Sequence, residues 1–349
     1  MNTGERAYLR LAEPAESAAG HDDGGMNHTP GRKDSRVVGC HPNETAAMSG
    51  TTGVLQQLRA VVLLGGTVRA SALQKVTHRA LVDLPVTPGM TVLQWWHRQF
   101  CAVAAAIGQQ PLTVRLVTDR SAPTPRALGT DGPVNLRIEQ DPSEFRGTGG
   151  LLSDLARQYD DDDRLLVVNA GQLLWDPMPG MVEALASVDA EVSILAQPDS
   201  TPSGLFLIRC GAMKGIPKVG FVDFKEQALP TIAKTKRVQV VRRDGCRGLP
   251  IRTLSGYLDA LKVYYQSYAA PEVRANPTDQ EWRATFGLIE NGARVAPTAV
   301  IHDSVVLAGA VVEPSAVVVR SVVGAKGVVN REQSVIDSLV GPVHTGAGK

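Results

Sequence analysis

Four residues that follow a buried apolar run could contribute to a binding site. The run Leu165–Val168 (LLVV) is short and wholly apolar, which predicts a strand in the middle of a sheet that is covered on both faces. Ligands of such sheets lie beyond the carboxyl ends of the strands. We therefore place the segment Asn169–Gln172 at the candidate site, with Asn169 and Gly171 as contact residues.

Two glycine-containing segments could let a ligand approach the backbone. Arg59–Leu64 (RAVVLL) reads as a buried strand that ends at Gly65-Gly66. Gly147, Gly149 and Gly150 precede an amphipathic helix that we expect over Leu151–Tyr159. Because glycine has no Cβ, such segments can approach a phosphate or a base, but they also form tight turns without any ligand.

The elements that position these residues alternate between strands and helices. Further strands are expected at Leu112–Thr118, Val134–Glu139, Ala190–Ala196, Leu205–Arg209 and Val238–Arg242, and helices at Thr91–Ile107, Pro177–Ser187 and Thr253–Tyr265. This alternation predicts an α/β domain over residues 55–268, with a mostly parallel sheet and helices on both faces. The alternating polarity of Val134–Glu139 suits an outer strand.

From Gly287 the sequence repeats itself every 17 residues. The copies are Gly287–Asp303, Ser304–Arg320 and Ser321–Asp337, and a partial fourth begins at Ser338. Aliphatic residues recurring about every six positions predict the short strands of a parallel β-helix over residues 284–349, with an ordinary β-sandwich as the alternative. His302, in the first copy, is a surface residue or a corner histidine of the kind that β-helix acyltransferases use.

Composition excludes several classes of protein. With 36 basic and 35 acidic residues, the net charge of +1 indicates neither a nucleic-acid partner nor an anionic membrane surface. No stretch reaches the roughly 18 apolar residues of a membrane span, and no secretion signal is visible. The four scattered cysteines suggest reduced thiols and a cytoplasmic protein. Residues 1–54 are expected to be a disordered tail, and 269–283 a linker.

The order of these motifs resembles the sugar-phosphate nucleotidyltransferases, also called nucleotide-sugar pyrophosphorylases. RAVVLLGG resembles their opening strand and glycine loop, and Gln140 with Arg146–Leu151 (RGTGGL) resembles their base-recognition segment. LLVVNAGQLLWDP resembles their metal-bearing strand end. Pro202–Ile208 resembles a later strand of the family that contains a Ser-Gly pair, and Arg252–Tyr265 resembles the closing helix. The resemblance covers about Leu55 to the end. It implies a Rossmann-like nucleotidyltransferase domain followed by a short left-handed β-helix.

The resemblance also implies roles for particular residues. Nucleotide contacts fall on Gly65, Gly66, Gln140, Gly147, Thr148, Asn169 and Gly171. The glycines would allow backbone approach, Gln140 would meet a base edge, and Thr148 would add a hydroxyl. Catalytic contacts with phosphate fall on Arg69 and Arg79, although Arg69 could equally form a surface salt bridge.

This chain departs from the family pattern where the family binds metal. Asn169-Ala170-Gly171 stands where the family has Asn-Gly-Asp, and the second metal aspartate falls on Pro250. Asp176 could reach the site, but it also suits the N-cap of the next helix. The run Asp160–Asp163 reads as a solvated turn. The hairpin that carries the family's Glu-Lys-Pro sugar contact is missing, so the metal ligands and the sugar are unknown.

Three functions remain open from the sequence. The first is a divergent nucleotidyltransferase that converts an NTP and a sugar 1-phosphate to an NDP-sugar and pyrophosphate, with Mg²⁺ and with weak or lost activity. The second is a non-catalytic regulatory relative that binds a nucleotide or nucleotide sugar and needs no cofactor. The third is an acyltransferase that uses His302. We expect the chain to form homo-oligomers through the β-helix.

Overall fold

The computed structural model describes residues 53–66, 70–119, 123–128, 132–141, 145–268 and 286–342. Residues 1–52 of the expected tail, the whole expected linker and Arg69 lie outside the described residues.

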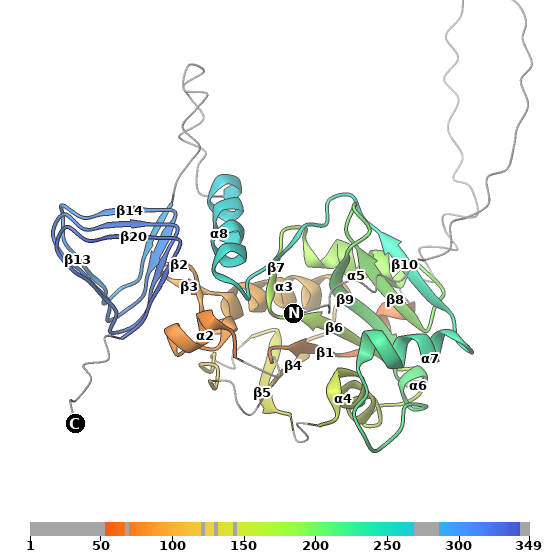
Figure 1. Cartoon of the computed structure of the whole chain (residues 1–349). Coiled ribbons are helices and arrows are strands. Elements are labelled where there is room, and N and C mark those ends of the chain that lie inside the picture. The colour runs from red at the N-terminus through yellow and green to blue at the C-terminus, as the bar shows by residue number, and fades with distance from the viewer. Residues whose placement is uncertain are drawn as a thin grey trace, which may run out of the picture. The chain divides into compact units, whose positions relative to one another are not determined.

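A seven-stranded sheet forms the centre of the α/β part (Figure 1). Its strands are β1 (Leu58–Leu64), β4 (Leu112–Thr118), β5 (Val134–Gln140), β6 (Arg164–Asn169), β8 (Val192–Ala196), β9 (Pro202–Arg209) and β10 (Val238–Arg242). Their order is β10-β8-β9-β6-β1-β4-β5, and only β9 runs antiparallel to its neighbours in this sheet. The predicted parallel-dominated sheet is confirmed, with β6 in its middle and β5 at its edge.

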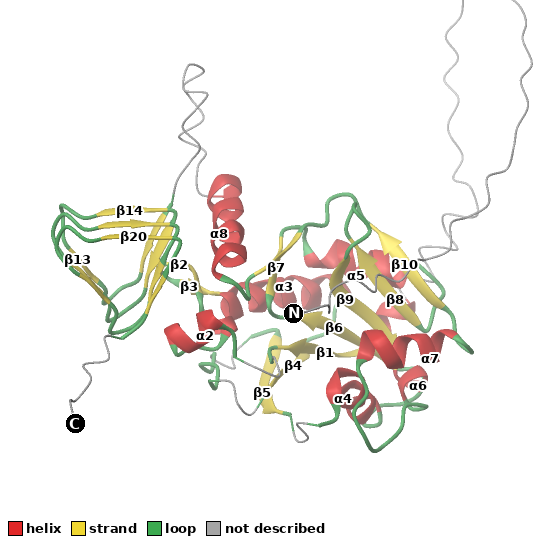
Figure 2. Cartoon of the chain, viewed as in Figure 1, coloured by secondary structure: helices red, strands yellow, loops and turns green. Residues whose placement is uncertain are grey.

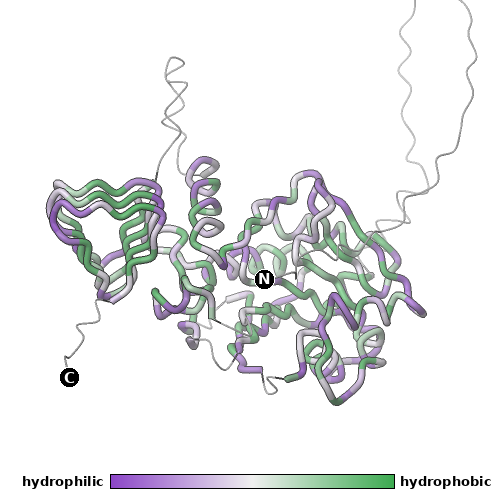
Figure 3. Tube along the Cα trace, in the orientation of Figure 1, coloured by the Kyte–Doolittle hydropathy of each residue, from purple (hydrophilic) through white to green (hydrophobic). Residues whose placement is uncertain are grey.

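Apolar side chains cover both faces of this sheet, because successive residues of each strand point to opposite sides. Val61 and Leu63 of β1 face one core, which includes α3 (Val92–Ile107) and α5 (Met178–Ala186) and continues to α8 (Leu254–Tyr268). Ala60 and Val62 face the other core, with α4 (Gly147–Ala156), α6 (Cys210–Met213) and α7 (Leu229–Ala233). Figures 2 and 3 show these helices and the hydrophobic runs along the strands. None of the helices described here is long and apolar enough to cross a membrane.

Several short elements were not expected from the sequence. They are α2 (Ala72–Thr77), β2 (Pro85–Thr87), β3 (Met90–Thr91), β7 (Gln172–Leu174), β11 (Gly248–Pro250) and the short helix Leu81–Asp83, whereas the short helix Phe224–Ala228 lies within Gly220–Pro230, where the sequence predicts one. Such segments are too short to show a period in the sequence. The antiparallel pair β7 and β11 matters for the site, because it sets Pro250 opposite Gln172.

Residues 286–342, which we call the repeat segment, form three parallel sheets. The first contains β12 (Gly287–Ile289), β15 (Ser304–Val306), β18 (Val322–Val323) and β21 (Leu339–Val340); the second contains β13 (Arg294–Val295), β16 (Val311–Val312) and β19 (Val328–Val329); the third contains β14 (Val300–His302), β17 (Val317–Val319) and β20 (Ser334–Ile336). Paired residues are one repeat apart, as in Ile301, Val318 and Val335. The arrangement is compatible with a parallel β-helix.

The corners of the repeat segment also follow the repeat. Asp303, Arg320 and Asp337 share a left-handed backbone conformation, with φ of 45°, 44° and 48°. Such a conformation turns the chain sharply between two short strands. Together with the register of the strands, it shows that the sequence repeat is a structural repeat.

The repeat segment packs against the α/β part through its first sheet. Leu288, Val305 and Val322 belong to the same apolar core as α3 and α8. At this boundary Arg79 donates to both carboxylate oxygens of Glu290, at 2.7 and 2.8 Å, and both side chains are nearly buried.

Candidate functional site

The candidate site lies where the order of the central strands reverses. From β1 the chain continues to β4 and β5 on one side, and then returns to β6 on the other side of β1. Leu64, at the tip of β1, pairs with Asn169 of β6 and with Val117 of β4. Ligands of open α/β sheets bind beyond the carboxyl ends of the strands at such a point. The two strand tips that the sequence singled out are therefore neighbours.

Gly65 and Gly66 lie at this point and are half-buried. A Cβ atom added to Gly65 would lie 2.6 Å from Leu116 Cδ1, and one added to Gly66 would lie 2.7 Å from the backbone N of Asp119. Gly65 and Gly66 therefore need to be glycine because they lie close to β4 and to Asp119, the residue that follows it. The role of these glycines toward a nucleotide stays a prediction.

The glycines before α4 contact another part of the same chain. Gly149 N and Gly150 N both donate to Val222 O, at 2.9 and 3.2 Å, and Thr148 Oγ1 accepts from Phe224 N. Gly147 has a φ of 68°, and a Cβ there would lie 2.6 Å from Val222 O. The helix begins at Gly147, not at the expected Leu151, because the carbonyl of Val222 satisfies its first free N–H groups. Gly147 and Thr148 thus contact residues 222–224, and their role toward a nucleotide stays a prediction.

Gln140 lies at the same edge of the sheet as the glycine turn. It ends β5 opposite Thr118 of β4, and its side chain is exposed. The amide offers both donors and an acceptor. The structure thus brings Gln140 to the carboxyl edge, with β4 between its strand and β1.

Asn169 and Gly171 form a tight turn after β6. Asn169 Oδ1 accepts a hydrogen bond from Gly171 N at 3.0 Å, so the side chain of Asn169 stabilises its own turn. Ile251 N donates to Gly171 O at 3.0 Å, which fixes the segment after β11 against this turn. A Cβ added to Gly171 would lie 3.0 Å from Arg252 Nε. The side chain of Arg252 therefore lies directly beside Gly171.

Arg252 is the residue of this site that the sequence interpretation missed. Burial lowers the pKa of its guanidinium. Within the described residues, no hydrogen bond or ion pair compensates that burial, although the residue as a whole retains exposed surface. The sequence did carry a signal, since an arginine stands two positions after Pro250, where the resemblance places a metal carboxylate.

Arg79 does not belong to this edge of the sheet. Its guanidinium is bound by the Glu290 carboxylate of the repeat segment, and its side chain is only 11% exposed. The two guanidinium N–H groups that form this bidentate pair are the donors that would otherwise bind a phosphate. The catalytic role predicted for Arg79 is therefore replaced by a structural one in this arrangement.

One expectation about acidic residues was wrong, and another holds only in part. Asp176 does not cap the following helix: Pro177 is at the N-cap, and Asp176 forms an ion pair with Arg243. In the acidic turn, Asp161 pairs with Lys214 and Asp162 with Arg209 at the surface, but Asp163 is 8% exposed and pairs with Arg59 at 2.7 Å. The turn is thus solvated at Asp160–Asp162 and buried at its last residue, which anchors it to β1.

The residues that follow β6 and β11 at the carboxyl edge do not fit a magnesium ion. Magnesium prefers oxygen ligands, commonly one or two carboxylates with water and phosphate. The turn after β6 and the end of β11 offer Asn169, Gly171, Pro250 and Arg252, of which none is acidic and one is cationic. In the part of the chain that the structure describes, no cluster of three or more His, Cys, Asp or Glu side chains could hold a metal.

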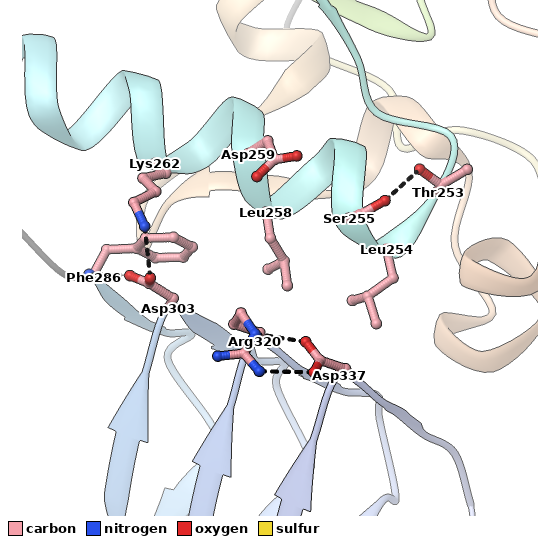
Figure 4. A pocket seen from close by; sticks show the side chains of 10 residues that line it. All are labelled: Thr253, Leu254, Ser255, Leu258, Asp259, Lys262, Phe286, Asp303, Arg320 and Asp337. Atoms are coloured by element: carbon pink, nitrogen blue, oxygen red, sulfur yellow. Dashed lines mark hydrogen bonds and ion pairs between the residues drawn. The ribbon is translucent and has the colours of Figure 1, made fainter.

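A pocket of about 420 Å³ lies elsewhere, between α8 and the repeat segment (Figure 4). Four of its five charged side chains are paired, Lys262 with Asp303 at 3.1 Å and Arg320 with Asp337 at 2.6 and 2.7 Å. His302, beside Asp303, has a side chain that is 44% exposed, and the following repeats have Val319 and Ile336 at its position. A surface role for His302 agrees with this placement.

Comparisons with known proteins complete the description. No protein-family model matches the sequence, and no curated protein matches it. Among solved structures, the chain is similar to HddC from Yersinia pseudotuberculosis, with 15% identity, a TM-score of 0.44, and coverage of 59% of this chain and 100% of that one. It is similar to a putative glucose-1-phosphate thymidylyltransferase from Bacillus anthracis in complex with a sucrose, with 14% identity, a TM-score of 0.44, and coverage of 58% and 94%. HddC complexed with GMP-PN matches with 15% identity, a TM-score of 0.43, and coverage of 59% and 100%.

Proposed function

We propose that this chain binds a nucleotide or a nucleotide sugar at the carboxyl edge of its central sheet, with weak or no nucleotidyl transfer. The observation that carries the proposal is the reversal of strand order between β1 and β6, which sets the Gly65-Gly66 turn beside the Asn169–Gly171 turn. Sheets of this type place ligands at such a reversal. The exposed amide of Gln140 and the unpaired guanidinium of Arg252 add a group for a base edge and a positive charge for phosphate.

The same edge supports weak or lost catalysis. Nucleotidyl transfer joins two polyanions, and a divalent ion usually neutralises the phosphates and orients the attacking oxygen. The turn after β6 and the end of β11, where the family pattern places the two metal aspartates, supply no carboxylate for that ion, and Asp176 is already paired with Arg243. Any residual reaction would convert an NTP and a sugar 1-phosphate to an NDP-sugar and pyrophosphate. Binding without turnover would instead make the chain a regulatory protein that responds to its ligand.

Calorimetry followed by a turnover assay tests this proposal. The full chain is titrated with each NTP and with UDP-glucose, GDP-mannose and ADP-glucose, in the presence and absence of Mg²⁺, and pyrophosphate release is then measured with each sugar 1-phosphate. We expect binding of at least one nucleotide or nucleotide sugar, with slow or absent release. A Gln140→Ala variant should bind more weakly and should change the preference among bases. Failure of every titration would reject the function.

We also propose that the repeat segment is a left-handed β-helix that joins subunits. The outer face of the sheet β14-β17-β20 carries Val300 and Ile336, each 52% exposed, with Val317 and Val319 between them. Exposed apolar surface of this kind is typical of an interface. Light scattering should show an oligomer that Val300→Glu with Ile336→Glu dissociates. Arg294→Glu, on the sheet that contains β13, is the control and should leave the oligomer intact.

A further inference from the structure

We infer that Arg252 takes the place of a divalent cation at this site: its guanidinium binds the phosphate groups of the ligand, so that binding needs no metal. The inference rests on the proposed function and names the group that recognises the anion. It would make the site selective for ligands that carry a phosphate or diphosphate.

The first step is the position of Arg252. The pair β7 and β11 and the hydrogen bond from Ile251 N to Gly171 O hold the segment before α8 against the turn that follows β6. Gly171 has no side chain, and Arg252 Nε lies 3.0 Å from where its Cβ would be. The guanidinium is therefore held at the carboxyl end of β6, beside the tip of β1.

The second step is charge. Three arginines that are more deeply buried than Arg252 are all paired: Arg79 with Glu290, Arg115 with Glu139, and Arg146 with Asp154. Arg252 has no such partner among the described residues, and burial lowers its pKa. A partly desolvated and unpaired cation costs free energy unless an anion binds to it. A phosphate supplies that anion, because a guanidinium matches phosphate oxygens with two parallel hydrogen bonds.

The third step excludes a metal from the same place. A guanidinium beside Gly171 repels a divalent cation, and neither the turn Asn169–Gly171 nor the segment from β11 to Arg252 carries a carboxylate that could hold one. Arg252 can thus supply the positive charge that a metal would otherwise bring to the phosphates. It does so with hydrogen-bond donors in fixed directions.

Calorimetry in EDTA tests the inference, with inorganic pyrophosphate, UDP-glucose, GDP-mannose and ADP-glucose as probes. We expect the wild-type chain to bind pyrophosphate and at least one nucleotide sugar with the same affinity in EDTA as in Mg²⁺. Arg252→Gln should weaken both by about tenfold to a hundredfold, the usual range for a charge-assisted hydrogen bond. Arg252→Lys should lie between the two, because lysine keeps the charge but not the paired donors. Arg331→Gln, an exposed arginine of the repeat segment, is the control and should bind like wild type.

A second pair of variants separates charge from space at Gly171. Gly171→Ala adds a methyl group that lies 3.0 Å from Arg252 Nε and 3.3 Å from Asn169 Oδ1, and both of these are side-chain atoms that can shift slightly, so binding should persist. Gly171→Asp adds the same carbon with a carboxylate, which should pair with Arg252 and weaken metal-free binding at least as much as Arg252→Gln does. Unchanged circular dichroism and urea midpoints show that each variant is folded.

The outcomes separate this inference from the function on which it rests. Binding of nucleotide sugars only with Mg²⁺, or undiminished binding by Arg252→Gln, overturns the inference and leaves the proposed function standing. Binding of pyrophosphate without any nucleotide or nucleotide sugar supports the anion site and rejects the function. Absence of all binding rejects both.

Discussion

Two arginines, in two regions of the molecule, differ in exposure and in pairing: Arg79 is nearly buried, whereas Arg252 keeps exposed surface although burial lowers its pKa. At the boundary with the repeat segment, Arg79 is bound on both of its terminal nitrogens by Glu290. At the carboxyl edge of the sheet, Arg252 has no counter-charge among the described residues. A paired charge in such a place organises the fold, whereas an unpaired one reduces stability unless a ligand compensates it. The difference shows which arginine to test for binding and which for folding.

The surroundings of the two arginines differ in the same way. At the boundary Ala308 N also donates to Glu290, the Tyr257 hydroxyl donates to Pro85 O at 2.5 Å, and Lys262 pairs with Asp303. At the carboxyl edge Asn169 stabilises its own turn, but Gln140 stays exposed and Arg252 unpaired. At the boundary, the charged side chains of Arg79 and Lys262 are thus paired within the chain, whereas Arg252 at the edge has no ion-pair partner among the described residues.

Breaking the boundary pair should have the largest effect on stability. Arg79→Met leaves the Glu290 carboxylate almost buried and unpaired, which we expect to cost about 3 kcal/mol. Urea unfolding followed by tryptophan fluorescence measures the loss. The double variant Arg79→Met with Glu290→Leu should recover most of it, because apolar groups of similar size can replace a buried ion pair. A loss in the double variant that equals the single loss would show that packing, not charge, matters there.

A change at the start of α4 should reduce stability, as a change in the Arg79–Glu290 pair does, although the sequence analysis places Gly147 at the binding site. Gly147→Ala forces alanine into a φ of 68° and sets its Cβ against Val222 O, which we expect to cost about 2 kcal/mol. Gly215→Ala is the control, because nothing lies near its Cβ, and should stay within about 0.5 kcal/mol of wild type. The same urea titration measures both. Equal stability of the two variants would show that residues 217–224 can move away from the glycines.

A change at Asp176 should reduce stability less than the changes at Arg79 and Gly147, and it tests whether this carboxylate is structural or binds a metal. Because it pairs with a partly exposed Arg243, Asp176→Asn should lower the free energy of unfolding by only about 1 kcal/mol. It should leave the response to Mg²⁺ unchanged, because a carboxylate held by arginine does not serve as a metal ligand here. Thermal melting with and without Mg²⁺ measures both quantities. A metal-dependent shift in wild type that disappears in Asp176→Asn would contradict the assignment.

The sequence predicted the parts of this structure that depend on periodicity. The 17-residue repeat reappears in the pairing of Ile301, Val318 and Val335, and the apolar run Leu165–Val168 lies in the central strand. It could not predict contacts between distant segments, such as Arg79 with Glu290 or Gly149 with Val222. Such contacts decide which glycines and arginines are paired within the chain. The two strand tips were correctly predicted to be neighbours, but Arg252 beside them was missed.

The smallest expected effect on stability is also the sharpest test of the comparison. Arg252→Met makes the same chemical change as Arg79→Met, but it removes a cation that has no partner, and its burial disfavours the charged form. We therefore expect the free energy of unfolding to stay within about 0.5 kcal/mol of wild type, or to rise, while metal-free binding of pyrophosphate is lost. Urea unfolding without ligand, repeated with saturating pyrophosphate in EDTA, measures both: the ligand should stabilise wild type and Arg79→Met, but not Arg252→Met. A large loss of stability in Arg252→Met would mean that Arg252, like Arg79, is part of the fold, and the contrast between the two regions would disappear.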